Sequence, residues 1–276
     1  MKTIPAQEIK AVVADLCIQA NQVLRVDVFV ALKKAYLAEK NKRAKEILKA
    51  IIDNARIAEK EKLAICQDTG LPVVFLEIGK DVHIKGDVKA AVNKGIEDGY
   101  KRASLRNSII RDPLARGTSG YSPAVIHSDI VKGDKIKITV LPKGFGCENK
   151  SQLKMFKPTV ALDEIKKFII EAVKSAGPDA CPPFVVGVGI GATADYASLL
   201  AKKALLRKLK TQNSKLKTLE EDLLKQINKL NIGPMGLGGK ATALAVNIET
   251  YPTHIAGLPV SVNISCHALR SATKEI

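Results

Sequence analysis

The hydrophobic pattern of the chain changes its period after about residue 60, and this change most limits the folds that the sequence can adopt. Before it, apolar residues recur at the spacing of one helix face: Ile9, Val12, Val13, Leu16, Cys17 and Ala20. This spacing predicts helices over residues 6–53. The first segment after the change, residues 71–78, is almost continuously apolar and predicts a strand.

Strand and helix patterns then mix without the strict alternation of a doubly wound sheet. Helical patterns return at 87–103, 160–176 and 194–230. Strand patterns occupy 184–190, two runs around a Lys-Gly-Asp turn within 124–142, and the alternating segment 241–266. The intervening stretches 107–123, 143–149 and 231–240 are predicted loops. We predict a mixed α/β (α+β) fold, as one domain over residues 1–276 with a helical lead-in at about 1–60.

Aliphatic side chains have to build the core, because the chain is 46% hydrophobic but only 4% aromatic and has no tryptophan. No apolar run reaches the roughly 18–20 residues that a membrane span needs. The N-terminus also lacks the apolar segment of a secretory signal. We therefore expect a soluble cytoplasmic protein that has no membrane partner.

The formal net charge of +16 comes from 44 Lys and Arg against 28 Asp and Glu. These basic residues are spread over predicted helix faces, without interleaved aromatic residues and without a zinc-finger or RNP pattern. The distribution favours solvated helix faces over a nucleic-acid surface, so no nucleic-acid partner is predicted. A basic patch for small dianions and an acidic partner subunit remain as alternatives.

A glycine pattern between the predicted strand at 184–190 and the following helix resembles a dinucleotide fingerprint in outline. Gly187, Gly189 and Ala192 form G-x-G-x-x-A. The acidic residue expected about 20 residues later is missing, because lysine-rich helix occupies that place. The context therefore disfavours a dinucleotide site, although a helix N-terminus that faces some other anion stays possible.

Three of the five cysteines stand at the ends of predicted elements, beside turn residues. Cys66 precedes Gln-Asp-Thr-Gly, Cys181 precedes two prolines, and Cys266 ends a strand-like run. Ligands that must converge on one point are usually placed in this way. Cys17 lies on the apolar helix stripe, which favours core packing. No pair of cysteines forms C-x-x-C, so a zinc ribbon or thioredoxin-like motif is not indicated.

Several chemistries fit these cysteines. Three thiolates on a four-iron cluster leave one iron with an open position for Lewis-acid chemistry. Zinc with three thiolates is the competing metal site, and three unconnected core cysteines are the structural alternative. A nucleophilic Cys66 would need a histidine nearby in space. The chain offers four: His83, His127, His254 and His267.

Three further residues have side chains that suit a site beside such a centre. His254 lies in a predicted loop, twelve residues before Cys266, and could transfer a proton there. Asp68 could act as its carboxylate partner or as a base. Arg106 offers the planar fork that suits a substrate carboxylate.

Six segments occur in an order that resembles a known family: CQDTGLPVVF, LRNS, PKGFGCENKSQL, ACPPFVVGVGIGATADYASLLAKKAL, GLGGK and PTHIAGLPVSVNISCHALR. They are similar to the alpha subunit, or N-terminal domain, of the iron–sulfur hydro-lyases. This family comprises the class I fumarate hydratases and the L-tartrate dehydratases. The resemblance runs from about residue 60 to the C-terminus.

The resemblance implies a [4Fe-4S] cluster that is held by three cysteines: Cys66, Cys181 and Cys266. Cys147 is left out of this ligand set, because relatives commonly have serine in that position of the KGFGCEN segment. The resemblance also implies catalytic roles for Asp68 and His254. It implies that three residues bind substrate: Gln67, Arg106 and Gly146.

Two departures from the family pattern bear on the assembly and on one loop. The loop before Pro123 reads RGTSGYS where many relatives read Asn-Thr-Gly-Asp-Asn. Thr253 stands where single-chain relatives carry an arginine, which fits the two-subunit branch. Single-chain relatives also continue into a second domain that closes the site. The resemblance therefore implies a separate beta subunit, in an assembly of the alpha2beta2 type.

The expected activity is that of a class I fumarate hydratase, the reversible hydration of fumarate to (S)-malate in the tricarboxylic acid cycle. The alternative is the dehydration of L(+)-tartrate to oxaloacetate by the alpha subunit of a tartrate dehydratase. In both reactions the substrate is a small dicarboxylate. A basic, non-catalytic binding or scaffold subunit is the more distant alternative.

Overall fold

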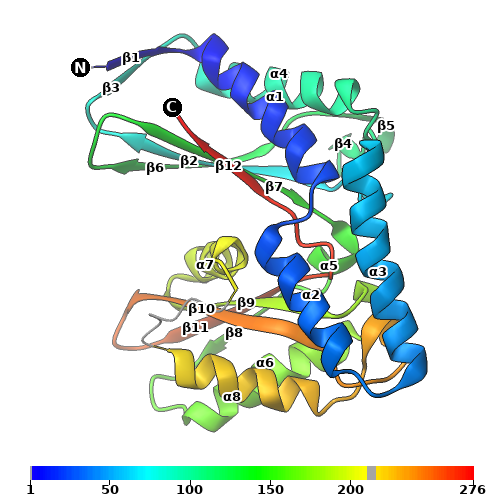
Figure 1. The fold of residues 1–276 in the computed structure, drawn as a ribbon. Helices are drawn as coiled ribbons and strands as arrows, with labels where there is room; N and C mark the ends of the chain where they lie inside the picture. Colours follow the sequence, from blue (N-terminus) through cyan, green and yellow to red (C-terminus); the bar gives the residue numbers. More distant parts are fainter. Residues whose placement is uncertain (1, 210–215) are drawn as a thin grey trace. The chain divides into compact units, whose positions relative to one another are not determined.

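The structure is a computed structural model of the chain, and it describes residues 2–209 and 216–276 (Figure 1). The chain divides into two compact units, each with its own sheet. Unit 1 comprises Met1–Arg25, Asn54–Phe145 and Arg270–Ile276, and unit 2 comprises Val26–Asp53 and Gly146–Leu269. The prediction of a single domain over residues 1–276 stays a prediction.

Unit 1 is built on a four-stranded sheet. Its strands have the spatial order β12 (Ala272–Glu275), β7 (Ile136–Lys143), β2 (Leu71–Gly79) and β6 (Val125–Val131). Helices α1 (Ala6–Gln22) and α4 (Val88–Arg102) pack together beside this sheet, as Figure 1 shows. They bury an aliphatic core that includes Val13, Ile96 and Val140.

Glycines allow the close packing of α1 and α4. A Cβ atom at Gly95 or Gly99 would lie 2.5 Å from the backbone oxygen of Lys10 or Ala14, respectively.

Unit 1 also contains two pairs of short strands. Strand β1 (Lys2–Pro5) runs parallel to β3 (Val82–Lys85), and β4 (Ile109–Asp112) pairs antiparallel with β5 (Arg116–Gly120).

Unit 2 has a second four-stranded sheet. Its strands have the order β10 (Ala243–Thr253), β9 (Phe184–Ala192), β11 (Leu258–Ser265) and β8 (Gln152–Phe156). Helix α7 (Ala194–Leu206) packs on one face, and α6 (Leu162–Ala176) with α8 (Lys217–Asn228) packs on the other (Figure 1). Helix α2 (Val26–Ala38) contacts β10. Helix α3 (Lys42–Glu61) follows α2 along the chain.

The G-x-G-x-x-A pattern has a packing explanation in unit 2. A Cβ atom at Gly187 would lie 2.1 Å from the Ala201 oxygen, and one at Gly189 would lie 2.0 Å from the Ala197 oxygen. Both oxygens belong to the backbone of α7. Only glycine therefore lets α7 lie this close to β9.

The predicted fold class is confirmed, because strands and helices mix in both units. The predicted helices over 6–53, 87–103 and 160–176 correspond to α1–α3, α4 and α6, and the predicted strands at 71–78 and 184–190 correspond to β2 and β9. Residues 194–230 contain α7 and α8, while 210–215 of that prediction lie outside the described residues. The alternating segment 241–266 contains β10 and β11.

The two predicted strands around the Lys-Gly-Asp turn are present as β6 and β7, and the apolar strand β2 lies between them. Two predicted loops differ from the structure. The predicted loop 107–123 contains the β4–β5 hairpin, in which Asp112 caps the turn by accepting from the amides of Leu114 and Ala115 at 2.9 Å. The predicted loop after Lys143 includes the four-residue helix α5 (Phe145–Glu148).

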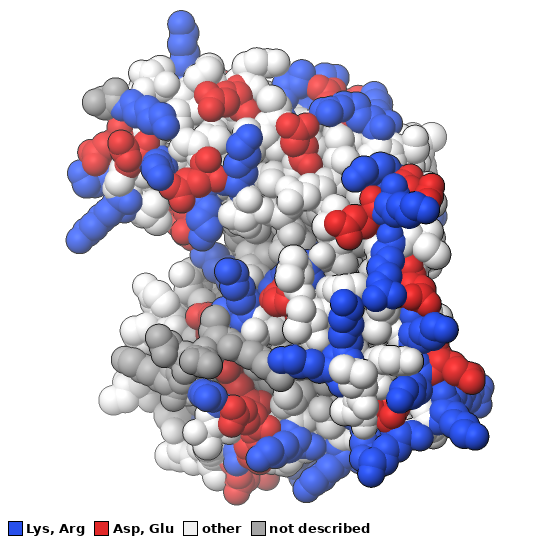
Figure 2. Space-filling view, in the orientation of Figure 1, with Lys and Arg blue, Asp and Glu red and all other residues white. Residues whose placement is uncertain are grey.

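No helix among the described residues combines the length and apolar character that crossing a membrane requires. Basic side chains are scattered over the face shown in Figure 2, with acidic side chains between them. Ion pairs also form along helices: Lys94 and Lys101 both pair with Glu97 on α4.

Candidate active site

The segment that carries Cys66 has no regular secondary structure, yet side chains of unit 1 fix its backbone. The Gln22 amide donates to the Lys62 oxygen at 2.8 Å, and the Asn54 amide donates to the Ile65 oxygen at 2.9 Å. The Ile65 amide in turn donates to the backbone oxygen of Asn21 at 2.9 Å. The half-buried Cys66 thus follows directly after a firmly held residue.

Asp68 is oriented by two backbone amides. Its Oδ1 accepts from the Gly70 amide at 2.9 Å, and its Oδ2 accepts from the Phe145 amide at 2.8 Å. Gly70 has a φ of +74°, and a Cβ atom there would lie 2.7 Å from the carbonyl carbon of Pro142. The turn that presents Asp68 therefore requires glycine at this position.

Thr69 joins the Asp68 segment to Arg106. The Arg106 amide donates to Thr69 Oγ1 at 3.1 Å, and the Tyr100 hydroxyl donates to the Thr69 backbone oxygen at 2.8 Å. Burial raises the pKa of Tyr100, which keeps this hydroxyl protonated as a donor. The side chains of Gln67 and Arg106 are exposed beside the half-buried Asp68.

Arg270 also contacts the segment that carries Asp68, and it was not among the predicted site residues. Its side chain is only 3% exposed, and its Nη2 donates to the backbone oxygen of Asp68. Among the described residues, its Nε and Nη1 have no hydrogen-bond partner. The only sequence signal is its place in the CHALR segment, which gives no sign of a contact with a residue 202 positions away.

In unit 2 the structure brings the Cys181 and Cys266 segments together. Cys181 has left-handed backbone angles (φ 54°, ψ 65°) after the short helix η1 (Pro178–Ala180). Its carbonyl oxygen accepts from the backbone amide of His267 at 3.4 Å and lies 3.1 Å from the Nδ1 of the same residue. Both cysteines are half-buried, and Cys266 directly follows β11.

Cys147 differs from these three cysteines in its surroundings. It is buried in the core of unit 2, and its thiol donates to the Ala180 oxygen at 3.1 Å. Cys17 is buried in the core of unit 1, where burial strongly raises the pKa of its thiol. Exposure thus separates the five cysteines into two buried residues and three half-buried ones, Cys66, Cys181 and Cys266.

Two other predicted site residues also lie in unit 2. His254 is exposed between β10 and β11, where its Nδ1 accepts from the Ala256 amide at 3.1 Å. In the neutral ring the hydrogen therefore resides on Nε2. Gly146 has room around it, because an added Cβ atom would lie 3.7 Å from its nearest neighbour, the Asp179 oxygen.

The predicted site residues therefore fall into two groups, each described within its own unit. Unit 1 brings together Cys66, Gln67, Asp68 and Arg106, and unit 2 holds Gly146, Cys181, His254 and Cys266. Within either unit, the described residues contain no group of three or more His, Cys, Asp or Glu that could hold a metal ion. The roles that the sequence predicts for these residues stay predictions.

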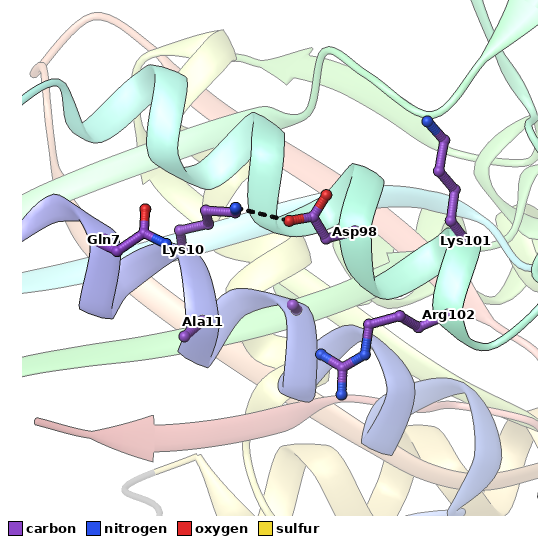
Figure 3. Close-up of a pocket in the computed structure, with 7 residues that line it drawn as sticks. Gln7, Lys10, Ala11, Asp98, Lys101 and Arg102 are labelled. Carbon is purple, nitrogen blue, oxygen red and sulfur yellow. Dashed lines mark ion pairs between the residues drawn. The ribbon is translucent and has the colours of Figure 1, made fainter.

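A separate open cavity of about 360 Å³ lies between α1 and α4 in unit 1. Figure 3 shows its lining, in which Lys10 pairs with Asp98 at 2.9 Å. None of the predicted site residues lines it; the lining consists of Gln7, Lys10, Ala11, Ala14, Asp98, Lys101 and Arg102. Arg102 is also paired, with Asp15.

The sequence was compared with known families and proteins. The family described as fumarate hydratase (Fumerase) matches residues 10–275. The putative L(+)-tartrate dehydratase subunit alpha of Methanocaldococcus jannaschii is 43% identical over 278 residues, which cover 98% of each chain. The L(+)-tartrate dehydratase subunit alpha of Escherichia coli K12 is 31% identical over 253 residues, which cover 90% of this chain and 84% of the relative.

Proposed function

The chain belongs to the fumarate hydratase (Fumerase) family of hydro-lyases, and from this premise we propose that it is the alpha subunit of an enzyme for four-carbon dicarboxylates. The proposed reaction is the reversible hydration of fumarate to (S)-malate. The observation that best supports it is the division of the cysteines by exposure. The three half-buried cysteines are those that the family resemblance assigns to a cluster.

We propose that Cys66, Cys181 and Cys266 hold a [4Fe-4S] cluster. A cysteine ligand has to be accessible to the metal and has to lose its thiol proton. The three half-buried thiols meet the first condition. At Cys17, in contrast, burial raises the thiol pKa and opposes ionisation. When bound, a cluster with three thiolate ligands supplies one iron with an open position, a Lewis acid for a carboxylate and a hydroxyl group. Cys147 is proposed to stay outside the ligand set, as a core residue.

The chain's own side chains would bind the substrate and move its protons. The exposed guanidinium of Arg106 can hold a carboxylate through two parallel hydrogen bonds, with Gln67 beside it and the backbone at Gly146 as a further contact. Asp68 and His254 are the proposed acid–base groups. The two amides on Asp68 fix the direction of its carboxylate, and the exposure of His254 lets it exchange protons with solvent.

A beta subunit is the proposed partner. The relatives from M. jannaschii and E. coli are named as alpha subunits, which supports an assembly with a second chain. An assembly of the alpha2beta2 type is our proposal for its stoichiometry. The net charge of +16 is compatible with docking onto an acidic partner. We propose the reducing cytoplasm as the compartment, because a cluster held by cysteine thiolates is sensitive to oxidation.

L(+)-tartrate is the second candidate substrate, and the names of the relatives favour it. Fumarate hydration and tartrate dehydration share the same substrate class, and the two hydroxy acids, (S)-malate and L(+)-tartrate, differ by one hydroxyl group. The deciding assay compares kcat/KM for fumarate, (S)-malate and L(+)-tartrate with one anaerobic preparation of the chain and its beta subunit. A tenfold or greater preference for tartrate would replace fumarate as the proposed substrate.

Serine substitutions test the cluster separately from the activity. Anaerobically reconstituted wild-type chain should be brown and contain about four irons, the content of one such cluster. Serine at Cys66, Cys181 or Cys266 should lower the iron content and bleach the chromophore, whereas Cys147→Ser should change neither. A colourless, iron-free wild-type chain after reconstitution would contradict the cluster and would favour a binding or scaffold subunit.

A further inference from the structure

We propose that Arg270 is a positioning residue for Asp68. This proposal rests on the proposed function, in which Asp68 takes part in proton transfer. The guanidinium of Arg270 donates from Nη2 to the backbone oxygen of Asp68, within unit 1. Arg270 itself has no role in the chemistry. It acts by fixing the peptide group that carries the Asp68 side chain.

The burial of Arg270 is hard to explain by stability alone. Its side chain is 3% exposed, and Nε and Nη1 find no hydrogen-bond partner among the described residues. Nor do those residues place any carboxylate in an ion pair with it. Removing a charge from water is costly, and an apolar side chain of similar volume would usually serve a core as well or better. The remaining feature of Arg270 is its directed bond to Asp68.

Four hydrogen bonds together fix the conformation of the segment. Arg270 holds the Asp68 carbonyl, and the Tyr100 hydroxyl holds the next carbonyl, that of Thr69. The carboxylate of Asp68 meanwhile accepts from the amides of Gly70 and Phe145. Without Arg270, the peptide group between Asp68 and Thr69 loses the side-chain donor at its carbonyl. Rotation of that peptide would turn the carboxylate away from its two amides.

Two variants of Arg270 separate positioning from folding. Arg270→Met fills a similar volume without a donor, and Arg270→Lys retains the charge and one donor. Gln22→Met is the matched control, because Gln22 also donates to a backbone carbonyl of this segment, that of Lys62, which precedes Cys66 and does not belong to the peptide group of Asp68. All three are assayed as anaerobic enzyme with its beta subunit, together with iron content and melting temperature.

We expect Arg270→Met to lower kcat about 100-fold, as a misplaced reacting group does, while KM stays within about threefold. Arg270→Lys should recover about tenfold of that loss. The iron content of both variants should match the wild type. Gln22 holds the segment before Cys66, so any effect of Gln22→Met should appear in the iron content, and kcat per bound cluster should stay within about twofold. Equal losses of kcat in Arg270→Met and Gln22→Met at equal melting temperatures would overturn the proposal.

Hydrogen exchange tests the same contact without any activity. In the chain alone, Arg270→Met should speed the exchange of the Gly70 and Phe145 amides by at least about tenfold, because both bonds end on Asp68. Gln22→Met should leave these two amides unchanged. If Arg270→Met does not fold, Arg270→Lys should show a smaller increase at the same amides. Unchanged exchange there would overturn the proposal, even if the wild type proves to have no hydro-lyase activity.

Discussion

The carboxylate of Asp68 accepts a hydrogen bond of 2.8 Å from the backbone amide of Phe145, a residue 77 positions later in the chain. The sheet of unit 1 makes this contact possible. Strand β2 begins at Leu71 and β7 ends at Lys143, and these two residues are register partners. The pairing of the two strands therefore brings the turn before β2 next to the turn after β7.

The first prediction concerns Asp68→Asn. An asparagine can accept from only one of the two amides, since its NH₂ group would face the other. We expect kcat to fall at least about 100-fold, the usual contribution of an acid–base group, and the free energy of unfolding to fall by about 1–2 kcal/mol. Steady-state kinetics and chemical denaturation measure the two effects.

Asp112→Asn is the control for this variant. Asp112 also accepts from two backbone amides, at the exposed turn of the β4–β5 hairpin. Its substitution should leave kcat unchanged. If Asp68→Asn retained kcat within about threefold of the wild type, the contribution expected of an acid–base group would be absent and Asp68 would lose its proposed role.

The second prediction concerns Gly144→Ala. An alanine Cβ here would lie 3.3 Å from Oδ2 of Asp68, which is closer than nine in ten natural Cβ contacts. We expect the carboxylate to shift and kcat to fall about tenfold, with little change in melting temperature. Gly120→Ala, where the nearest atom is 3.9 Å away, should retain full activity. Equal activities of the two variants would contradict the expectation that a Cβ atom at position 144 displaces the Asp68 carboxylate.

The third prediction separates packing from nucleotide binding at the G-x-G-x-x-A pattern. Gly187→Ala would place a Cβ atom 2.1 Å from the Ala201 oxygen, so α7 has to move away from β9. We expect a loss of about 3 kcal/mol in the free energy of unfolding. Gly257→Ala, with its nearest neighbour at 4.0 Å, should cost far less. A rise in melting temperature with NAD⁺ that Gly187→Ala abolished would instead favour a dinucleotide site.

The fourth prediction is a pH dependence that arises from Glu39, which is 4% exposed in unit 2. Burial by itself would raise the pKa of this carboxyl group. Hydrogen bonds from the backbone amides of Asn41, Lys240 and Lys40, together with the charge of Lys240, lower the pKa below its ordinary value of 4.5. The ionised form therefore stabilises the folded state.

The sign of this effect follows from the lowered pKa. The stabilisation by Glu39 is complete above the unfolded-state pKa of 4.5 and is lost as the pH falls through the lower folded-state value. Glu39→Gln should lower the free energy of unfolding by about 1–3 kcal/mol at pH 7. Denaturation from pH 7 down to pH 3 should show this difference shrinking. A difference that stays constant over this range would show that the charge of Glu39 is not responsible.

Hydrophobic period was enough to predict the main elements, because each depends on its own residues. Strand β2 and helix α4 appear where apolar runs and helical spacing place them. The pairing of strands depends instead on distant segments. The runs that became β6 and β7 flank a tight turn, yet each pairs with β2, whose apolar side chains occupy the centre of the sheet.

In the candidate site, likewise, local features could be predicted from the sequence and long-range contacts could not. The segments around Cys66, Cys181 and Cys266 could be selected from their position beside turn residues. In the structure His267, the residue after Cys266, contacts the Cys181 carbonyl oxygen, but the roles of the three cysteines stay predictions. Arg270 could not be selected. Its bond to Asp68 joins residues 202 positions apart, and nothing in the local pattern marks a buried arginine that donates to a backbone oxygen.

The most direct test of the proposed function is the hydration of fumarate by the anaerobically reconstituted chain with its beta subunit, measured beside Cys66→Ser and Cys147→Ser. We predict that the wild type and Cys147→Ser form (S)-malate at similar rates, and that Cys66→Ser forms none. The assay also follows L(+)-tartrate, because the relatives carry that name. Iron-loaded wild-type enzyme that converted neither substrate, or a fully active Cys66→Ser, would contradict the proposed hydro-lyase mechanism.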